Sequence, residues 1–214
     1  MTSISPHIDN LDSFLQHCRR RRYERGQTII YAGDVPSTLY YIIEGSVSVL
    51  LEQDDDKEII VAYLNPGDFF GEMGLFDGQP SRSACCRARQ SCEIAEIHYD
   101  KFRLFIHEHP EILLTIGGQM AHRLRNTTRK VGDLAFYDVT GRIARALMEL
   151  SKQPDAATHP DGIQIRITRQ ELGRMVSCSR EVAGRVLKTL EEQQLIAIDG
   201  RYVVVYGARP TLSK

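Results

Sequence analysis

The feature that most constrains the fold of this sequence is the stretch from Pro110 to Tyr137, which has the pattern of a long helix. Apolar or small residues recur there at alternating spacings of four and three, at Leu113, Gly117, Met120, Leu124, Thr127, Val131 and Leu134. This a/d heptad seam is typical of helices that pack lengthwise on one another. Pro110 suits the first helical position, and Glu111 complements the positive end of the helix dipole. Such a helix would run roughly 40 Å.

A seam of this length needs a partner. The turn-punctuated strands before it and the compact helical unit after it are not obviously long enough to cover it. The simplest partner is the same helix from a second copy of the chain, and the alternative is a core helix lying on its own sheet. Gly117 and Gly118 allow close approach but lower helix propensity, so packing must hold them helical. We therefore expect a homodimer formed through residues 110–137.

Composition indicates a soluble globular protein. The 214 residues are 42% hydrophobic and 26% charged, which is ordinary for such proteins, and no apolar run approaches the ~20 residues of a membrane span. The N-terminus has no apolar signal region, which favours a cytoplasmic location. The five cysteines contain no C-x-x-C pair, which argues against a zinc site or a disulfide framework. We expect no metal.

The first part of the chain is predicted to form strands. Runs rich in Val, Ile and Tyr alternate with turn residues at intervals near ten, which favours an antiparallel barrel or jelly roll that could enclose one small ligand. The expected strands are Thr28–Tyr31, Leu39–Ile43, Ser46–Leu51, Glu58–Leu64 and Cys92–His98. A short amphipathic helix is expected at 8–18. The arginines Arg19–Arg22 are interpreted as a solvated surface turn or as a contact patch for an acidic partner.

A glycine-rich segment carries the clearest chemical signal in this region. It reads Gly67-Asp-Phe-Phe-Gly-Glu-Met-Gly-Leu-Phe76, and Arg82-Ser83 follows about ten residues after Gly71. Backbone N–H groups freed by glycine, together with the arginine fork, can cradle an anion. The Glu72 carboxylate beside them could accept hydrogen bonds from sugar hydroxyls. The alternative is a glycine-rich barrel corner with a surface arginine.

The C-terminal part differs in charge and in pattern. Residues 138–214 carry a net charge of +3, against −4 for residues 1–137, which hints at a nucleic-acid partner. Asp138 is a good N-cap, so we expect the long helix to break at Phe136–Asp138 and to form a hinge there. Residues 154–162 are expected to form an exposed loop, and Ile163, Ile165 and Ile167 alternate as in a half-buried strand.

Residues 168–190 have the signature of a helix-turn-helix. Thr168 opens a helix with a capping box to Glu171, and Ser179 caps a second helix after a tight turn. The outward residues Arg180, Glu181 and Arg185 suit the reading of guanine and cytosine edges. Residues placed to hold phosphates are Arg169, Ser179 and Lys188. The alternative is a solvated helix face with a Glu181–Arg185 ion pair.

Two hydrophobic runs complete this unit. Leu195–Ile198 and Tyr202–Tyr206 flank Asp199-Gly200, which predicts a hairpin and makes the unit a winged helix-turn-helix with Arg201 on the wing. Ser177 occupies the position in the turn where helix-turn-helix units usually have glycine, and Val182 stands where similar units often have a threonine whose hydroxyl can contact a phosphate. If φ is positive at Ser177, that residue costs about 1 kcal/mol.

These motifs together resemble those of the bacterial cyclic-AMP receptor protein family, also called catabolite gene activators, of the CRP/FNR superfamily. The glycine-rich segment looks like the phosphate-binding cassette of cyclic-nucleotide-binding domains. The resemblance covers residues 10–207 and includes Lys130–Phe136, Asp138–Arg142 and Gln153–Ala156. It departs at Cys85-Cys86, where the family often has an aromatic and an aliphatic residue. We interpret these cysteines as small buried strand residues.

The resemblance implies a role for individual residues. Glu72 would hold the ribose 2′-hydroxyl beside the Gly71 backbone, and Arg82 and Ser83 would hold the cyclic phosphate. Arg123 would pair with Glu72. The adenine would be reached by Thr127 and by Thr128 of the other subunit. The loop 154–162 would contact RNA polymerase.

The resulting prediction is an α+β protein: an N-terminal antiparallel jelly roll with a long dimerisation helix (1–137) and a C-terminal winged helix-turn-helix (138–214). The implied function is a cyclic-AMP-dependent transcription regulator that binds a palindromic TGTGA-type DNA site. Alternatives are the same fold with another ligand, such as cyclic GMP, a cyclic dinucleotide or haem, and a regulatory subunit that acts on a protein partner. No Ser/His/Asp order, paired acids or metal spacing indicates an enzyme.

The heptad seam predicts that the chain is a dimer in solution without ligand. Leu124→Lys places two like charges in the seam and should dissociate the dimer. Light scattering at micromolar concentration measures this, and a wild-type mass equal to that of the monomer contradicts the prediction.

Overall fold

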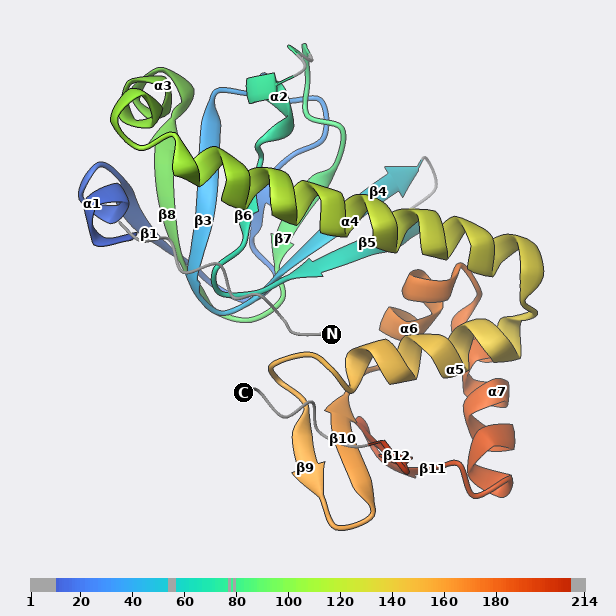
Figure 1. Ribbon diagram of the computed structural model, residues 1–214. Helices are drawn as coiled ribbons and strands as arrows, with labels where there is room; N and C mark the ends of the chain where they lie inside the picture. The colour runs from blue at the N-terminus through green and yellow to red at the C-terminus, as the bar shows by residue number, and fades with distance from the viewer. Residues whose placement is uncertain (1–10, 54–56, 77, 79, 209–214) are drawn as a thin grey trace. The chain divides into compact units, whose positions relative to one another are not determined.

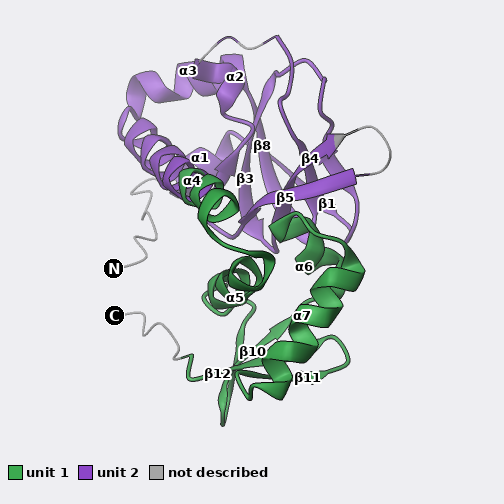
Figure 2. Ribbon diagram, turned by 90° about the vertical axis from the view of Figure 1, so that its right-hand side faces the viewer, with its two compact units in different colours: residues 1–3, 128–214 green, residues 4–127 purple. Residues whose placement is uncertain are grey.

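The computed structural model describes residues 11–53, 57–76, 78 and 80–208. These residues fall into two compact units that divide at Thr127–Thr128, as Figure 2 shows in purple and green. The division lies within α4 (Glu111–Phe136), so residues 111–127 of this helix belong to the N-terminal unit and residues 128–136 belong to the C-terminal one. Each unit is described by itself below.

The N-terminal unit is built on two four-stranded sheets whose neighbouring strands are all antiparallel, which confirms the predicted jelly-roll class (Figure 1). In the first sheet the order is β1-β8-β3-β6, with β1 Arg19–Tyr23, β3 Thr38–Glu44, β6 Phe69–Phe70 and β8 Cys92–His98. In the second it is β2-β7-β4-β5, with β2 Thr28–Ile30, β4 Val47–Gln53, β5 Lys57–Leu64 and β7 Cys85–Ala88.

Two apolar clusters hold this unit together. One lies between the sheets and includes Ile42 and Ile94 from the first sheet and Val47 and Cys86 from the second. The other covers the opposite face of the first sheet with α1 (Leu11–Gln16), α3 (Tyr99–Glu108) and the start of α4. Phe14 is completely buried there, with its ring edge-on to Phe69 at 5.4 Å. The first sheet is therefore covered on both faces, and α4 is fixed to it at Ile112 and Ile116.

The expected heptad seam on α4 is mostly exposed in the single chain. Leu124 is 69% exposed, Val131 62% and Leu134 52%. A side-chain carbon added at Gly117 or Gly118 would meet no neighbouring atom. Only the N-terminal end of the helix therefore packs on the sheet of its own chain. The rest of the seam is an exposed apolar stripe of the kind that a partner can cover.

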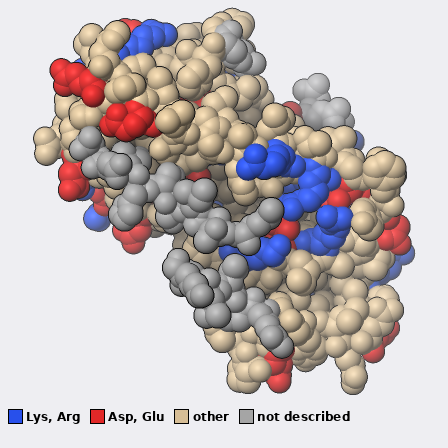
Figure 3. Space-filling view, in the orientation of Figure 1, with Lys and Arg blue, Asp and Glu red and all other residues tan. Residues whose placement is uncertain are grey.

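The break at Phe136–Asp138 is confirmed. α4 ends at Phe136, and the side chain of Asp138 caps α5 (Val139–Leu150) by accepting from the N–H of Gly141 at 2.8 Å. Ion pairs connect the last turns of α4 to α5: Arg129–Glu149 at 3.3 Å and Asp133–Arg145 at 3.2 Å. Figure 3 shows a cluster of Lys and Arg with acidic side chains among them over these two helices.

The C-terminal unit has the predicted winged helix-turn-helix. It contains α6 (Arg169–Val176), α7 (Arg180–Glu192) and a sheet in the order β11-β12-β10-β9. The strands are β9 Ala157–His159, β10 Gly162–Arg166, β11 Ile196–Asp199 and β12 Tyr202–Tyr206. Thr168 and Ser179 cap the two helices as expected. The core includes Ile143, Leu147, Leu172, Ala183 and Leu187.

Several sequence expectations need correction. The arginine run is not a turn but strand β1, which pairs with β8, so that Arg20 and Arg22 lie near Glu93. Four consecutive arginines do not show the apolar alternation of a strand. They are tolerated here because β1 lies at the edge of its sheet, where side chains can remain in solvent. Part of the expected loop 154–162 is strand β9, which pairs with β10. Helix α3, the short helix α2 (Met73–Phe76) and strand β6 were not predicted. The expected turn at 54–56 and the helix start at 8–10 lie outside the described residues.

The helix-turn-helix turn contains a strained residue. Ser177 ends α6 with φ 57° and ψ 54°, which is the left-handed conformation that favours glycine. The concern raised by its place in the sequence is therefore confirmed.

Replacing Ser177 with Gly should raise the free energy of unfolding by about 1 kcal/mol, because glycine adopts this conformation without a Cβ clash. Urea denaturation measures the change. Ser177→Val is the matched control and should lower stability, because a β-branched residue fits positive φ poorly. Equal stability of the two variants would show that the turn stores no strain.

Candidate functional site

The glycine-rich cassette forms a polar corner at the end of the first sheet. Gly71 has φ +74°, and a Cβ at this position would lie 3.0 Å from Nη1 of Arg82 and 3.2 Å from the Thr38 carbonyl oxygen. Arg82 donates from Nη1 to the Gly71 carbonyl at 2.7 Å and from Nη2 to the Thr38 carbonyl at 2.7 Å. A glycine at 71 is therefore needed both for the backbone turn and for the approach of the guanidinium.

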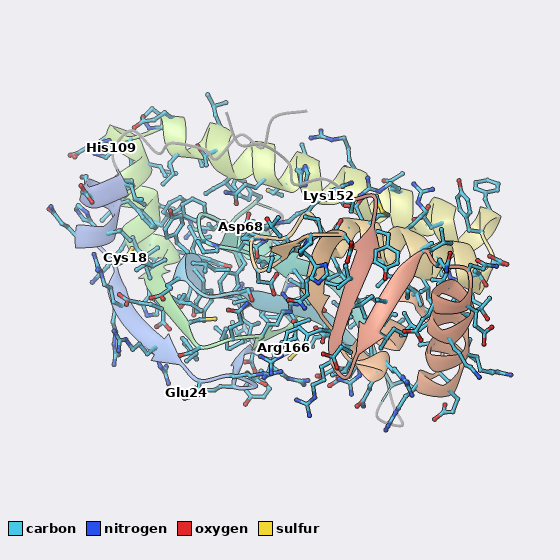
Figure 4. The ribbon with its side chains drawn as sticks, turned by 90° about the horizontal axis from the view of Figure 1, so that it is seen from below. Cys18, Glu24, Asp68, His109, Lys152 and Arg166 are labelled. Atoms are coloured by element: carbon cyan, nitrogen blue, oxygen red, sulfur yellow. The ribbon has the colours of Figure 1, made fainter. Side chains whose placement is uncertain are left out.

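Glu72 is the buried acid of this corner. It is 6% exposed, and its Oε1 accepts from Nη1 of Arg123 at 3.1 Å. Arg123, from α4, also donates to the Phe69 carbonyl and lies 3.7 Å from the Asp68 carboxylate; Figure 4 labels Asp68. A buried carboxylate requires such a partner, because an unpaired buried charge is strongly destabilising. The Glu72–Arg123 pair predicted from the resemblance is present.

The remaining predicted ligand residues lie at the edges of the corner. Ser83 is exposed, and its hydroxyl is 3.7 Å from the Met73 sulfur. Thr127 and Thr128 are both exposed on α4. Thr127 follows Arg123 by four residues, so the two lie on the same face of the helix. The structure thus places Gly71, Glu72, Arg82 and Arg123 together and leaves the two threonines further along the helix.

Sequence reasoning missed three members of this corner. The Tyr99 hydroxyl lies 2.9 Å from Nη1 of Arg82 and donates to the Gly71 carbonyl, and the carbonyl of Thr38 accepts from Arg82. Asp68 lies in the glycine-rich segment, but its place in the sequence did not indicate a contact with Arg123. No local pattern indicated Tyr99 or Thr38. Thr38 begins β3 and Tyr99 begins α3 directly after β8, so the pairing of β3 with β8 brings both of them to Arg82.

A second candidate site lies on α7. Five of the six residues predicted to contact DNA line one shallow depression of about 650 Å³: Arg169, Arg180, Glu181, Arg185 and Lys188. Ser179 stands at its end as the N-cap, where its hydroxyl accepts from the N–H of Val182 at 3.2 Å. Gly184 also lines it, and a Cβ there would be 3.3 Å from the Arg169 side chain. The depression brings together an acceptor and several donors, from α7 and from Arg169 at the start of α6, and base readout requires both kinds of group.

The acid in this depression is held in its charged form. The pKa of Glu181 is lowered by a hydrogen bond from its own backbone N–H, by the Ser179 hydroxyl, and by the charges of Arg180 and Arg185. Glu181 therefore acts as an acceptor at neutral pH, which is what a contact with the amino group of cytosine needs.

Similarity to known proteins decides the family. The model of the cyclic nucleotide-binding domain matches residues 20–109, and that of the Crp-like helix-turn-helix domain matches residues 141–207. The cAMP-activated global transcriptional regulator Vfr of Pseudomonas aeruginosa is 60% identical over 96% of this chain and 97% of its own length. The chain belongs to the CRP family of transcription regulators.

Other members of the CRP family are nearly as similar. The cAMP-activated global transcriptional regulator CRP of Salmonella typhimurium is 55% identical over 93% of this chain and 95% of its own length. Among solved structures, the c-di-GMP-responsive global regulator CLP of Xanthomonas campestris has a TM-score of 0.86 at 48% identity, covering 92% of this chain and 98% of that one. A CRP family regulator of Thermus thermophilus has a TM-score of 0.75 at 27% identity, covering 87% and 91%.

The cysteines where the chain departs from the CRP family pattern are buried strand residues, as predicted. Cys85 is 1% exposed and Cys86 is 6% exposed. Burial raises the pKa of Cys86 to about 12, and it also raises the pKa of Cys85. Thiols of this kind stay protonated and are poor nucleophiles. Within the described ranges, no group of His, Cys, Asp and Glu is placed to hold a metal ion, and no helix has the length and apolarity to cross a membrane.

Removing Arg123 should expose the cost of a buried, unpaired carboxylate. We expect Arg123→Met to lower the free energy of unfolding by about 3 kcal/mol. The double variant Glu72→Gln, Arg123→Met should lose at least about 1 kcal/mol less unfolding free energy than the two single variants together. In the double variant the residue at 72 is neutral, so no buried charge is left without a partner. Urea denaturation of the four proteins measures this coupling, and strict additivity would show that the pair does not matter.

Proposed function

We propose that this protein is a cyclic-AMP-dependent transcription regulator that binds a two-fold symmetric DNA site as a homodimer. The observation that carries the proposal is the presence, in one chain, of the buried Glu72–Arg123 pair beside Arg82 and of the basic depression on α7. The cAMP-activated regulators that are 55–60% identical support the choice of ligand. An enzymatic function has no support in either site.

The chemistry of the corner fits a cyclic nucleotide. Arg82 supplies the planar, charged donors that a phosphate prefers, and Ser83 can add a hydroxyl. Glu72, already oriented by Arg123, can accept from the ribose 2′-hydroxyl. We propose that Thr127 of the same subunit and Thr128 of the partner subunit reach the adenine. The ligand would then touch both long helices at once.

The DNA-binding role follows from the α7 depression. Arg180, Glu181 and Arg185 would read base edges in the major groove, and Arg169, Ser179 and Lys188 would hold phosphates. Two α7 helices about 34 Å apart would read both halves of a TGTGA-type palindrome. The dimer would form through residues 110–137, whose exposed apolar stripe supports this.

The two parts of the chain would have different roles. Residues 1–137 would bind the nucleotide and the partner subunit, and residues 138–214 would bind DNA; the Asp138 cap supports this boundary. The segment 154–162, which includes β9, would contact RNA polymerase. A regulator of this kind would act in the cytoplasm.

One relative favours a second candidate ligand. The regulator CLP, 48% identical, is described as c-di-GMP responsive. The same fold can therefore accompany a cyclic dinucleotide, and the choice has to be measured. The deciding experiment follows the fluorescence anisotropy of a labelled TGTGA palindrome while cyclic AMP, cyclic GMP or c-di-GMP is added separately. We expect cyclic AMP alone to raise DNA affinity at least tenfold; a response only to c-di-GMP would reject cyclic AMP as the effector.

Loss of the Arg82 guanidinium should abolish nucleotide binding. Arg82→Leu removes the charge-assisted donors of the corner, so calorimetry should detect no binding of cyclic AMP. The double change Thr127→Val, Thr128→Val should instead keep binding within about a factor of ten to a hundred but abolish the rise in DNA affinity. Unchanged affinity in the first variant, or full activation of the second, would contradict the assignments.

Base readers and phosphate contacts should behave differently on substitution. Arg180→Ala and Arg185→Ala should each cost roughly 1–3 kcal/mol at one guanine and relax specificity at that position. Lys188→Ala should weaken binding to all sequences alike and reduce the salt dependence. Equal losses on every sequence in all three variants would show that the arginines do not read bases.

A further inference from the structure

The side chain of Gln119 makes an unusual connection between α4 and the cassette. Its Oε1 accepts from the N–H of Phe69 at 2.8 Å, and its Nε2 donates to the carbonyl of Gly67 at 2.8 Å. One side-chain amide thus pairs with two backbone groups two residues apart. This is the pattern by which one residue of a parallel strand, whose N–H and C=O point to the same side, pairs with its neighbour.

The backbone of this turn is shared between β3 and α4. The N–H of Gly67 donates to the carbonyl of Ile42 at 2.9 Å, and the N–H of Ile42 donates to the carbonyl of Asp68 at 3.0 Å. The groups on the other side, the carbonyl of Gly67 and the N–H of Phe69, are those that meet Gln119. Because β6 is the last strand of its sheet, the Gln119 amide occupies the place of a further strand.

The same helix face holds the buried acid of the cassette. Arg123 follows Gln119 by one helical turn and bonds Glu72 and the Phe69 carbonyl. Nη2 of Arg123 also lies 3.4 Å from Oε1 of Gln119. Gln119, Arg123 and Thr127 are spaced by four, so they form one line along α4. Phe69 is held through its N–H by Gln119 and through its carbonyl by Arg123.

We infer that Gln119 is a positioning residue that transmits occupancy of the cyclic-nucleotide site to α4, and this inference rests on the proposed function. A ligand that moves Glu72 can move α4 only as far as rigid contacts connect them. Arg123 is a long, flexible side chain and gives a single connection to Glu72. The two Gln119 hydrogen bonds fix the register of α4 on the backbone that leads into Glu72, so the helix follows the cassette.

A residue that transmits ligand binding should affect the coupling factor between cyclic AMP and DNA without affecting the affinity for cyclic AMP, whereas a merely structural residue would change both. The coupling factor is the ratio of the DNA dissociation constants without and with saturating cyclic AMP. Gln119→Leu should leave the cyclic-AMP dissociation constant within about tenfold, since Glu72, Arg82 and Arg123 remain, and should lower the coupling factor about fivefold or more. Gln119→Glu keeps the acceptor for Phe69 but loses the donor to Gly67, so it should give an intermediate coupling factor. His122→Leu, exposed on the same helix, is the matched control.

Calorimetry for the nucleotide and anisotropy for the DNA give both quantities for the four proteins, and thermal unfolding reports their stability. A Gln119→Leu variant with lower stability and an unchanged coupling factor would overturn the inference, as would an equal loss in the control. If Gln119→Leu does not fold, an unchanged coupling factor in Gln119→Glu has the same meaning. A wild-type protein without response to any cyclic nucleotide overturns the proposed function as well; a wild-type response equalled by the Gln119 variants overturns only this inference.

Discussion

The ion pair between Glu72 and Arg123 is the interaction on which both candidate roles of the N-terminal unit depend. Glu72 is almost fully buried, and a buried carboxylate needs a charged partner. That partner comes from α4, the helix that also carries the exposed apolar stripe. The need to neutralise the acid therefore fixes α4 against the cassette. In the proposed function, a ligand hydroxyl at Glu72 would share the carboxylate with Arg123, which would connect ligand binding to the position of α4.

Arg82 adds a second constraint of the same kind. Its guanidinium is held by the carbonyls of Gly71 and Thr38 and by the Tyr99 hydroxyl. These neutral partners orient the guanidinium without cancelling its charge, as the proposed contact with a phosphate would need. The contact also explains why Gly71 cannot carry a side chain: a Cβ there would lie 3.0 Å from Nη1. Tyr99 and Thr38 thus position the guanidinium of Arg82.

Features that depend on residues close together in the sequence could be predicted, and features that depend on residues far apart could not. The α4 seam, the Asp138 cap, the capped helices of the helix-turn-helix and the wing hairpin all follow from spacing within a few residues, and each is present. The arginine strand β1 was missed because its stability comes from pairing with β8 rather than from its own residues. Tyr99, Thr38 and Gln119 were missed for the same reason, since their partners are far away in the sequence: Tyr99 and Gln119 bond distant backbone groups, and the Thr38 carbonyl accepts from the Arg82 side chain. The Glu72–Arg123 pair lacks a local signal too and was found only through the family resemblance.

The contacts of α4 give a physical reason why the proposed dimer and the proposed ligand would depend on each other. The helix is anchored at its start by Ile112 and Ile116, tied in its middle by Gln119 and Arg123, and linked at its end to α5 by Arg129 and Asp133. Between the last two zones lie Leu124, Thr127 and Thr128, which are all exposed. This is where a partner helix and an adenine ring would compete for or share the same surface. A ligand changes an equilibrium only by binding its two states unequally. A ligand would bind the two states unequally if it contacted these residues in one relative position of the two subunits' α4 helices and not in the other.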